Sequence, residues 1–460
     1  MKSAYKLTAK IVFPEGAAPG AGGLGNRQFL AKNGKDEIVL RGSALAGVLR
    51  TAYAHGKRMF SEDSKISRWF GSASEGDLDS SSFVQVADAV VNCETILDRT
   101  HNLINRHTGA AVKKGLFSLE AIPPMAGADL SITLKPGAGE IEEYIRFINN
   151  ISKIMGNGLL VGGNSNRGIG RMIVDGELYL RSFDLDTLDG IADFLDAEYE
   201  ERKTGVAMTG EPQTVSEILD HLVISLELGI PRGEDILVGD GQAVDYALKP
   251  QTVTFADGTE HWRIPGSSIR GIFRGWMTRL AARDDEKIRD STAQWYELDE
   301  SDDPNAYNPD FIGWGFEKPK DREEYQKNPE KLGDPILDLF GSMYKKGRIH
   351  ITDAFSQTTT ATDVQDRMHV AIDRFSGGSH EGALFQNQVL AGDRLRFLLS
   401  ISLAMPSEKE VEWLIKTLRA LHLGILNIGS AKGCGRLEIK SVSAKGCRVE
   451  AITKFAREVN

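Results

Sequence analysis

The chain has 460 residues, of which 41% are hydrophobic and 26% charged, and its formal net charge is −10. These proportions are typical of a soluble protein with two or three domains, and they exclude a mainly disordered chain and a generally basic surface. No run approaches the roughly 20 apolar residues that a membrane helix needs, so we expect no membrane contact. Three cysteines without a Cys-x-x-Cys pair favour the reducing cytoplasm over a disulfide scaffold or a zinc site.

The first half of the chain alternates strand and helix patterns. The opening run MKSAYKLTAKIVF has the two-residue period of a strand and lacks the cleavage site of a signal peptide. Periodicity predicts strands at 4–13, 82–91, 128–134 and 170–180, and helices at 43–57 and 141–155. The segment between the two middle strands, 92–127, is far longer than a hairpin requires, which is typical of functional or disordered segments.

The second half repeats this order. Strands are predicted at 221–228, 347–355, 393–403 and 435–442, and helices at 267–282 and 408–423, with a long segment again between the middle strands at 356–392. The order strand, helix, strand, strand, helix, strand predicts an α+β protein with two ferredoxin-like domains in tandem, as in RNA-recognition folds. We expect a first domain at 1–181, a linker at 182–219 and a second domain at 220–460.

Three motifs occur in the same order in both halves, which indicates a duplicated domain. They are Gly42-Ser43 with Gly266-Ser267, residues 99–109 with 367–378, and residues 162–172 with 427–437. The second half also carries an insertion at about 284–334, with 16 Asp and Glu against 7 Lys and Arg. Negative charge is therefore concentrated in one segment, and an RNA partner is not excluded. The insertion is expected to contact a neighbouring subunit or to form a mobile surface loop.

The repeated Gly-Ser elbows stand where helices begin. Ser43, Ser267 and Ser268 are candidates for the helix N-terminus, where free N–H groups favour phosphate. Arg50 follows on the first helix, and Arg270 and Arg274 lie one turn apart on the second, so these arginines could add charge to the same sites. Plain helix capping is the alternative interpretation.

The glycine-rich loops at 162–172 and 427–437 follow a helix and precede a strand. A phosphate-binding P-loop has the opposite order and a Gly-Lys-Ser/Thr ending, so ATP binding is disfavoured. The loops could place Arg167 and Lys432 on an RNA backbone, or they could simply form tight turns. In the long segment of the second half, Arg374 and Phe375 could bind and stack on nucleotides, with Arg106 at the matching place in the first half. A solvated loop is the alternative.

The segments IPGSSIRGIFR, RMHVAIDRFSGGSHEGALF and GSAKGCGRLEI, in this order, resemble the RAMP superfamily (repeat-associated mysterious proteins). Within it they are similar to the backbone subunits of type III CRISPR effector complexes, and two such domains in one chain resemble the fused subunit of the type III-D branch. The resemblance covers the second half apart from its insertion. The first half departs from the pattern at RGSALAGVLR and NRHTGAAVKKGLF.

The resemblance implies a function in antiviral defence. Such subunits line up along a guide RNA, and a long thumb hairpin between the middle strands, matching 372–385 here, flips bases of the guide–target duplex. The implied partners are guide RNA, target RNA and other type III effector subunits. An aspartate after the first strand of the domain cuts target RNA with the help of Mg²⁺ or Mn²⁺, which would make the chain a divalent-metal-dependent endoribonuclease.

Asp245 best matches the position of that aspartate and could also hold the metal, with Asp240 as the fallback and Asp235 less favoured. Gly25 or Asn26 occupies the matching place in the first half, and Glu15 comes too early, so we expect the first half to bind RNA without cutting it. A solvated loop aspartate, a purely structural backbone subunit and an unrelated tandem RNA-recognition protein are the alternatives. Guide processing by histidine is disfavoured, because His101, His261 and His369 have no partner that the sequence identifies.

Overall fold

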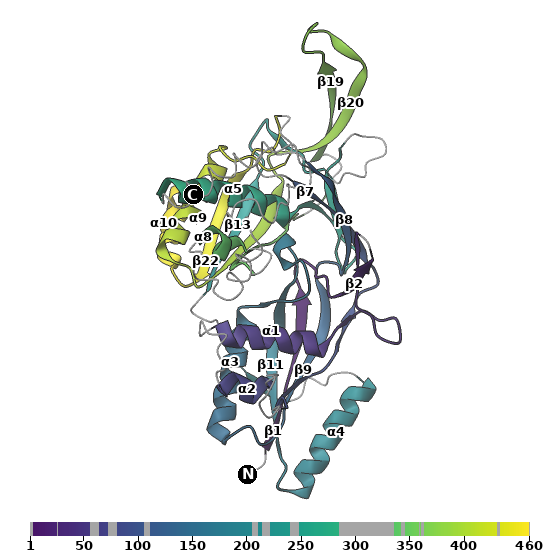
Figure 1. The fold of residues 1–460 in the computed structure, drawn as a ribbon, viewed down its shortest axis with the longest axis vertical. Coiled ribbons are helices and arrows are strands. Elements are labelled where there is room, and N and C mark those ends of the chain that lie inside the picture. Colours follow the sequence, from purple (N-terminus) through teal and green to yellow (C-terminus); the bar gives the residue numbers. More distant parts are fainter. Residues whose placement is uncertain are drawn as a thin grey trace, which may run out of the picture.

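The computed structural model describes most of the chain, and Figure 1 shows its arrangement. The described residues are 3–24, 26–55, 64–71, 81–104, 111–204, 210–213, 221–239, 248–284, 335–341, 346–357, 359, 363–429 and 433–459. Helices and strands are mixed along the chain, and the strands form several sheets. The expected α+β class is therefore confirmed. Within these residues, no helix has both the length and the hydrophobicity required to cross a membrane.

The first half forms an antiparallel sheet around its first strand. The strands are β1 Ser3–Phe13, β4 Val39–Leu40, β5 Val84–Val86, β6 Ala89–Asn92, β9 Ala126–Leu134, β10 Leu159–Leu160, β11 Arg171–Asp184 and β12 Glu211–Gln213. β1 lies at the centre and pairs antiparallel with both β11 and β9. β5 and β6 pair with β9 on its other side, so the central order is β11-β1-β9-β6.

Alternation along β1 separates the two faces of this sheet. Its odd-numbered residues from Tyr5 to Phe13 are buried in the core. The helices that complete this core are α1 Gly42–His55, α2 Ser64–Phe70 and α3 Ile141–Gly156. Trp69 of α2 stacks on Phe147 of α3 with 4.2 Å between ring centroids. Each large apolar side chain buried in this way contributes roughly 1.5–3 kcal/mol.

The opposite face of β1 carries helix α4, Leu188–Thr204. Lys6 is buried, and its Nζ lies 3.2 Å from Glu198 and also pairs with Glu201. β12 pairs with β11 nearby. The expected linker at 182–219 thus contains a helix and a short strand that both contact the first-half sheet, while the domain limits themselves stay a prediction.

The second half repeats the arrangement around β13. Its strands are β13 His221–Gly229, β15 Gln251–Thr254, β16 Glu260–Ile264, β17 Ile349–Ile351, β18 Ala354–Ser356, β21 Arg396–Ala404 and β22 Glu438–Gly446. Its described helices are α5 Gly266–Asp284, α8 Pro335–Phe340, α9 Glu408–His422 and α10 Val449–Val459. β13 pairs antiparallel with β21 and β22, as β1 does with β9 and β11. The same order of elements therefore gives the same central pairing twice.

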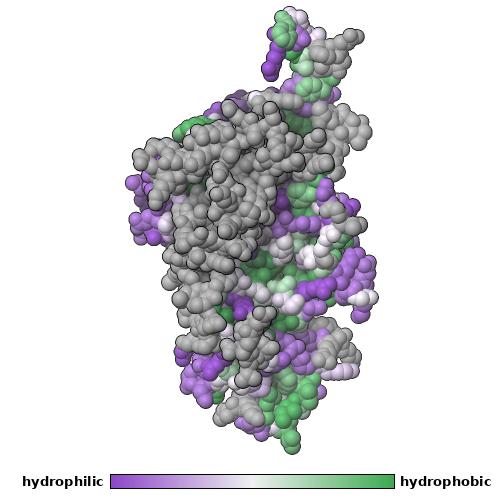
Figure 2. All heavy atoms as spheres, viewed as in Figure 1, coloured by the Kyte–Doolittle hydropathy of each residue, from purple (hydrophilic) through white to green (hydrophobic). Residues whose placement is uncertain are grey.

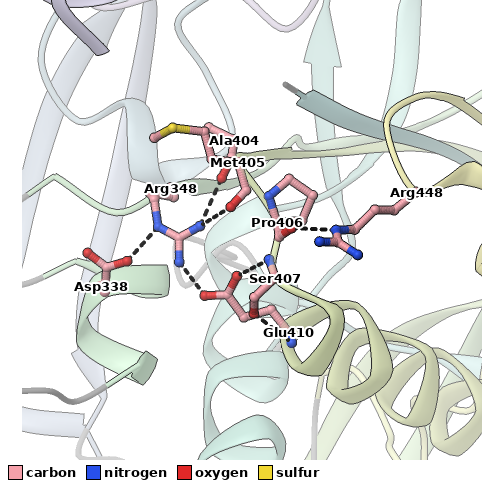
Figure 3. A network of polar contacts seen from close by, with 8 residues as sticks. All are labelled: Asp338, Arg348, Ala404, Met405, Pro406, Ser407, Glu410 and Arg448. Atoms are coloured by element: carbon pink, nitrogen blue, oxygen red, sulfur yellow. Dashed lines mark hydrogen bonds and ion pairs between the residues drawn. The ribbon is translucent and has the colours of Figure 1, made fainter. Parts of the chain in front are cut away.

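A half-buried arginine ties the helices of the second half to its sheet, as Figure 3 shows. Arg348 donates from Nε to Asp338 at 2.6 Å, from NH1 to two carbonyl groups at the end of β21, and from NH2 to Glu410. Glu410 also accepts the N–H of Ser407 at 2.8 Å in a capping box that begins α9. Because all three nitrogens of this half-buried guanidinium have partners, the network fixes α8, β21 and α9 relative to one another.

Each long segment between middle strands contains an antiparallel hairpin. The strands are β7 Leu97–Ile104 and β8 Ala111–Ala121 in the first half, and β19 Val364–Ile372 and β20 Ser379–Ala391 in the second. Three shorter strands extend these hairpins into small sheets: β2 Gly20–Leu24, β3 Arg27–Leu30 and β14 Asp235–Ile236. The β19–β20 hairpin projects from the top of the molecule in Figure 1, whereas β7 and β8 lie beside the second half.

Candidate nucleic-acid interface

Both Gly-Ser elbows begin a helix directly at the glycine. The backbone N–H of Gly42 donates to Asp88 Oδ1 at 2.7 Å, and that of Gly266 donates to Asp353 Oδ1 at 2.8 Å. A Cβ on Gly42 would lie 2.0 Å from the carbonyl oxygen of Val86, and one on Gly266 would meet a strand carbonyl at 2.6 Å. Glycine is required because each helix start presses against its neighbouring strand. The repeated motif therefore builds the same helix–strand contact twice.

The expectation that Ser43 and Ser267 form the helix caps is wrong. α1 and α5 begin one residue earlier, and an aspartate from the adjoining strand segment accepts the first N–H instead. Ser43 and Arg50 are exposed and lie seven residues apart on one face of α1, while Ser267 and Ser268 are half-buried. Of these four residues, only Ser43 and Arg50 are exposed on the surface. RNA contact by all four stays a prediction.

Arg270 has a structural role that sequence analysis did not anticipate. Its guanidinium donates to the carbonyl oxygens of Ile349 and Phe340 and lies over the Phe340 ring at 5.1 Å. Burial lowers the pKa of Arg270 to about 10. Its donors are therefore engaged between α5, α8 and β17 in this structure, rather than turned toward a phosphate. Arg274, one turn later, is half-buried.

The glycine-rich loop of the first half lies at the junction of the two halves. The carbonyl of Gly168 accepts the backbone N–H of Asp353 at 2.9 Å, and Nε2 of His350 lies 3.3 Å from the carbonyl oxygen of Ile169. A Cβ on Gly168 would be 2.2 Å from Asp353 Oδ1. Arg167 packs its guanidinium over Phe117 of β8 at 4.2 Å. This loop therefore joins the halves, a role that its sequence did not indicate.

The two glycine-rich loops also make matching contacts within their own halves. Gly170 donates its N–H to the carbonyl of Gly16 at 2.8 Å, and Gly435 donates to that of Asp235 at 2.7 Å. In both cases the acceptor lies in the segment that follows the first strand of the half, Gly16 in a loop and Asp235 in β14. The tight-turn interpretation thus accounts for these glycines. Lys432 lies outside the described residues.

A buried ion pair connects the first hairpin to the elbow of the second half. Arg99 of β7 lies 2.7 Å from Asp353, and their side chains are 4% and 0% exposed. Arg263 of β16 lies 3.6 Å from the same carboxylate. Burial, followed by the charges of Arg99, Arg167 and Arg263, lowers the pKa of His101 to about 3. The junction thus holds several guanidinium groups around a neutral histidine and one carboxylate.

A polar pocket of about 330 Å³ opens at this junction. It is lined by Asp98, Thr100, Lys249, Pro250, Gln251, Thr252, Trp262, Arg263 and Gln388. The lining comes from the first hairpin, the edge of the second-half sheet and the second hairpin. Its amides, hydroxyls and cations, together with the carboxylate of Asp98, suit a polar group.

The tip of the second hairpin presents an arginine and an aromatic ring to solvent. Asp373 Oδ1 accepts the backbone N–H groups of Phe375 at 2.9 Å and Ser376 at 2.7 Å. These hydrogen bonds lower the pKa of Asp373 and fix the turn. Phe375 is fully exposed, and Arg374 is exposed beside it. A rigid turn that displays a bare aromatic ring is well suited to stacking on a base.

One face of the same hairpin is apolar and exposed. Met368, Val370 and Ile372 alternate along β19, and Leu384 lies opposite Val370 on β20. Figure 2 shows hydrophobic surface on this projecting hairpin. A group of exposed apolar side chains like this one is typical of surfaces that bind other molecules.

The two hairpins share one internal contact and differ in the partner of a matching arginine. His101 stacks on Phe117 with 5.4 Å between centroids, and His369 stacks on Phe385 with 5.2 Å. Arg367 pairs with the buried Asp235 of its own half, whereas Arg99, at the matching position, pairs across the junction. The first hairpin is thus docked and the second is free to project. Arg106, at the expected first tip, lies outside the described residues.

The aspartates expected to cut RNA, Asp245 and Asp240, also lie outside the described residues. Asp235, the less favoured candidate, is buried and paired with Arg367. In the first half, burial raises the pKa of Glu15, while the Arg171 guanidinium at 2.7 Å opposes this effect. Across the described part of the chain, no three His, Cys, Asp or Glu side chains are grouped to hold a metal.

Sequence analysis missed the residues that join these parts. Asp88 and Asp353 stand in the short repeated strings ADA and TDA, Arg99 opens the repeated segment 99–109, and Arg263 carries no motif of its own. The matching spacing of the two aspartates could have revealed them as part of the duplication. Nothing in the local sequence indicates that Arg99 crosses to the other half.

Two stretches of the chain match a known family. The sequence profile of the RAMP superfamily matches residues 16–173 and 236–438, which together make up more than half of the chain. The first stretch begins in the loop after β1 and ends in β11, and the second begins in β14 and ends at the start of β22. A comparison with curated proteins finds no match. The two matches therefore cover corresponding parts of both halves.

Proposed function

Since this chain belongs to the RAMP superfamily, we propose that it is a guide-RNA-binding backbone subunit of a type III CRISPR effector complex. The family indicates a CRISPR-associated RNA-binding subunit that works with RNA and other subunits. Two matched stretches in one chain support the more specific assignment to a fused, type III-D-like subunit. Both halves would then bind the same RNA strand in succession.

Each half is proposed to be a ferredoxin-like RAMP domain with its hairpin as a thumb. The central orders β11-β1-β9-β6 and β22-β13-β21-β18 support this assignment, since both place the first strand between the last and the third. Each hairpin leaves its sheet between the two middle strands of the half. The hairpins are therefore placed alike relative to the sheets, as a repeated RNA-binding unit requires.

The exposed tip of the β19–β20 hairpin is the observation that carries the proposal. Phe375 would stack on or between bases, and Arg374 would bind a neighbouring phosphate. The apolar face formed by Met368, Val370, Ile372 and Leu384 would line the gap that the hairpin opens in the guide–target duplex. Stacking of one base on an aromatic ring contributes about 1–3 kcal/mol, so this single contact is measurable.

Target cleavage by the second half is the further part of the proposal. Asp245, with Asp240 as the fallback, would orient the reacting 2′-hydroxyl or hold the divalent cation that the resemblance implies. Carboxylate oxygens suit Mg²⁺ and Mn²⁺, and the cation would supply charge stabilisation at the phosphate. The first half would bind RNA without cutting it. The alternative is a purely structural backbone, with cleavage by other subunits.

The binding role is tested with Phe375→Ala in the full chain. Guide-RNA affinity is expected to fall about 5- to 150-fold, which corresponds to the loss of one stacked base. Phe375→Trp is the matched control and should retain affinity, since its ring also stacks. Thermal stability should stay unchanged in both, because residue 375 has no packing to lose. Equal RNA binding by the Ala variant and the wild type would contradict the proposed role of the tip.

The cleavage role is tested in the assembled complex with Asp245→Ala. One product should disappear from the set of target fragments, and chelation of divalent cations should abolish all cleavage while guide RNA remains bound. Asp363→Ala, in a described loop near the start of β19, is the matched control. An unchanged fragment pattern in both Asp245→Ala and Asp240→Ala would favour the structural backbone.

A further inference from the structure

Helix α4 exposes a stripe of apolar side chains. Leu188, Ile191, Leu195 and Tyr199 are 86%, 39%, 60% and 61% exposed. Their spacing of three to four residues places them along one side of the helix. In Figure 2, hydrophobic surface is visible at the lower end of the molecule, where Figure 1 places α4. A surface helix normally buries such a stripe, so its exposure indicates a contact with another molecule.

The orientation of α4 is fixed from its other side. Glu198 and Glu201 pair with the buried Lys6 of β1, and Glu198 also accepts the hydroxyl of Thr133 at 3.3 Å. Phe194 packs edge-on against Phe183 of β11, with 5.3 Å between centroids. Because the helix is held at these points, it cannot turn its apolar stripe inward without breaking them. The exposed stripe is thus a property of the folded first half.

An acidic row runs beside the stripe. Asp189, Asp193, Asp196 and Glu200 are exposed and recur every three to four residues on the side of α4 away from the sheet contacts. This row repels phosphate, so RNA is a poor occupant of the stripe. A protein surface with basic residues beside apolar ones is complementary to it.

A second copy of the chain is also a poor occupant. Two antiparallel copies of α4 packed through their stripes would place one acidic row against the other. Two parallel copies would place each acidic row against the side by which the other helix already packs on its own sheet. Self-association through α4 is therefore opposed by charge in one arrangement and by sterics in the other.

We propose that α4 docks an amphipathic helix of a different protein, with Lys or Arg along one edge and apolar residues along its face. The partner would cover the stripe and pair its basic edge with the acidic row. The site lies on the face of β1 opposite the core formed with α1 and α3, in the segment between the two family matches. It adds a protein-docking surface to the proposed RNA-binding role and does not depend on RNA.

A synthetic helix-forming peptide with a leucine face and a lysine edge is the direct probe. It should bind the full chain, and Leu195→Asp should weaken binding at least about tenfold, because it places a charge at the centre of the stripe that the peptide would cover. Leu423→Asp is the matched control, since Leu423 is similarly exposed at 58% but lies at the end of α9. A peptide with glutamate at the lysine positions should bind at least about tenfold more weakly. Equal binding of both peptides, or no binding of the lysine peptide, would overturn the proposal.

Hydrogen exchange of α4 tests the same site in the native assembly. Its amides should exchange more slowly in the complex that contains the other protein subunits than in the free chain. Guide RNA alone should not slow their exchange. Leu195→Asp should remove this protection while guide-RNA affinity is retained. The assignment would be refuted if RNA alone slowed the exchange of the α4 amides, or if the complex did not slow it. It would also be refuted if the chain self-associated and Leu195→Asp abolished that self-association. If the wild-type chain did not bind guide RNA, the proposed function would be refuted, while the proposed docking surface on α4 would be unaffected.

Discussion

Replacement of Asp353 by asparagine should destabilise the second half far more than the matching change at Asp88. Both aspartates accept a backbone N–H at the start of a helix, at 2.8 and 2.7 Å. Asparagine keeps an oxygen for this hydrogen bond and removes the charge. Only Asp353 is also paired with guanidinium groups, the buried one of Arg99 and the half-buried one of Arg263. The two substitutions therefore differ mainly in the ion pairs that they break.

The expected magnitudes are well separated. Removing one partner of a buried ion pair costs about 3–5 kcal/mol, because the other charge is left without compensation. Asp353→Asn should thus lower the free energy of unfolding by about that amount. Asp88 is exposed, and asparagine is as good a cap as aspartate, so Asp88→Asn should cost less than about 1 kcal/mol. Arg99→Met should cost less than Asp353→Asn, since Asp353 keeps Arg263 nearby.

Native-state hydrogen exchange of the α5 and β13 amides measures this free energy for the second half within the full chain. The double variant Arg99→Met/Asp353→Asn completes a mutant cycle and should cost at least about 1 kcal/mol less than the sum of the single changes. Equal losses for Asp353→Asn and Asp88→Asn, or additive costs in the cycle, would show that the pair across the junction does not stabilise the second half.

Further predictions concern pH, the junction loop and the hairpin tip. Burial, as the largest cause, holds the pKa of His101 at about 3 and that of His350 at about 4. Histidine in the unfolded chain binds its proton near pH 6.5, so the contribution of each neutral histidine to the free energy of unfolding is complete above that pH and is lost as the pH falls toward the folded pKa. The loss is about 2 kcal/mol per histidine at pH 5. Urea titrations across this range should show the decrease in the free energy of unfolding with falling pH, and His101→Asn should make that decrease smaller. Gly168→Ala should lower the melting temperature by more than Gly163→Ala in the same loop, at a cost above about 1 kcal/mol, because Gly168 has φ +90° and no room for a Cβ whereas Gly163 has open space. Arg374→Gln should reduce the salt dependence of guide-RNA binding by about one phosphate contact, and an unchanged slope would place Arg374 away from the backbone.

The repeated elements of the fold could be predicted from sequence because their signals are local. The alternating run in β1 and the apolar stripe of α3 determine the faces that each element buries. The duplication is visible in the glycine motifs, because a helix start that presses against a neighbouring strand requires glycine at the same place in both halves. The hairpin tip was also recognisable, because Arg374 and Phe375 stand in a short turn with glycines after it.

The junction could not be predicted, because its contacts depend on how the two halves meet. Arg99 and Asp353 are more than 250 residues apart, and neither has neighbours in sequence that indicate the pair. The same limit applies to Arg270, whose spacing on the helix predicts an RNA contact. Its burial depends on Phe340 and Ile349, which come from elements that follow it in the chain.

The ion pair between Arg99 and Asp353 bears on the order in which this protein can be made. During synthesis the ribosome releases the whole first half before Asp353 emerges, so Arg99 is already positioned when its counter-charge arrives. A gene fragment encoding only the later half would lack this preformed cation and would leave Asp353 with Arg263 as its remaining described ion-pair partner. Because the two similar domains are fused in a single polypeptide, Arg99 and Asp353 can pair within one chain. On separate chains they could pair only after the two chains had associated.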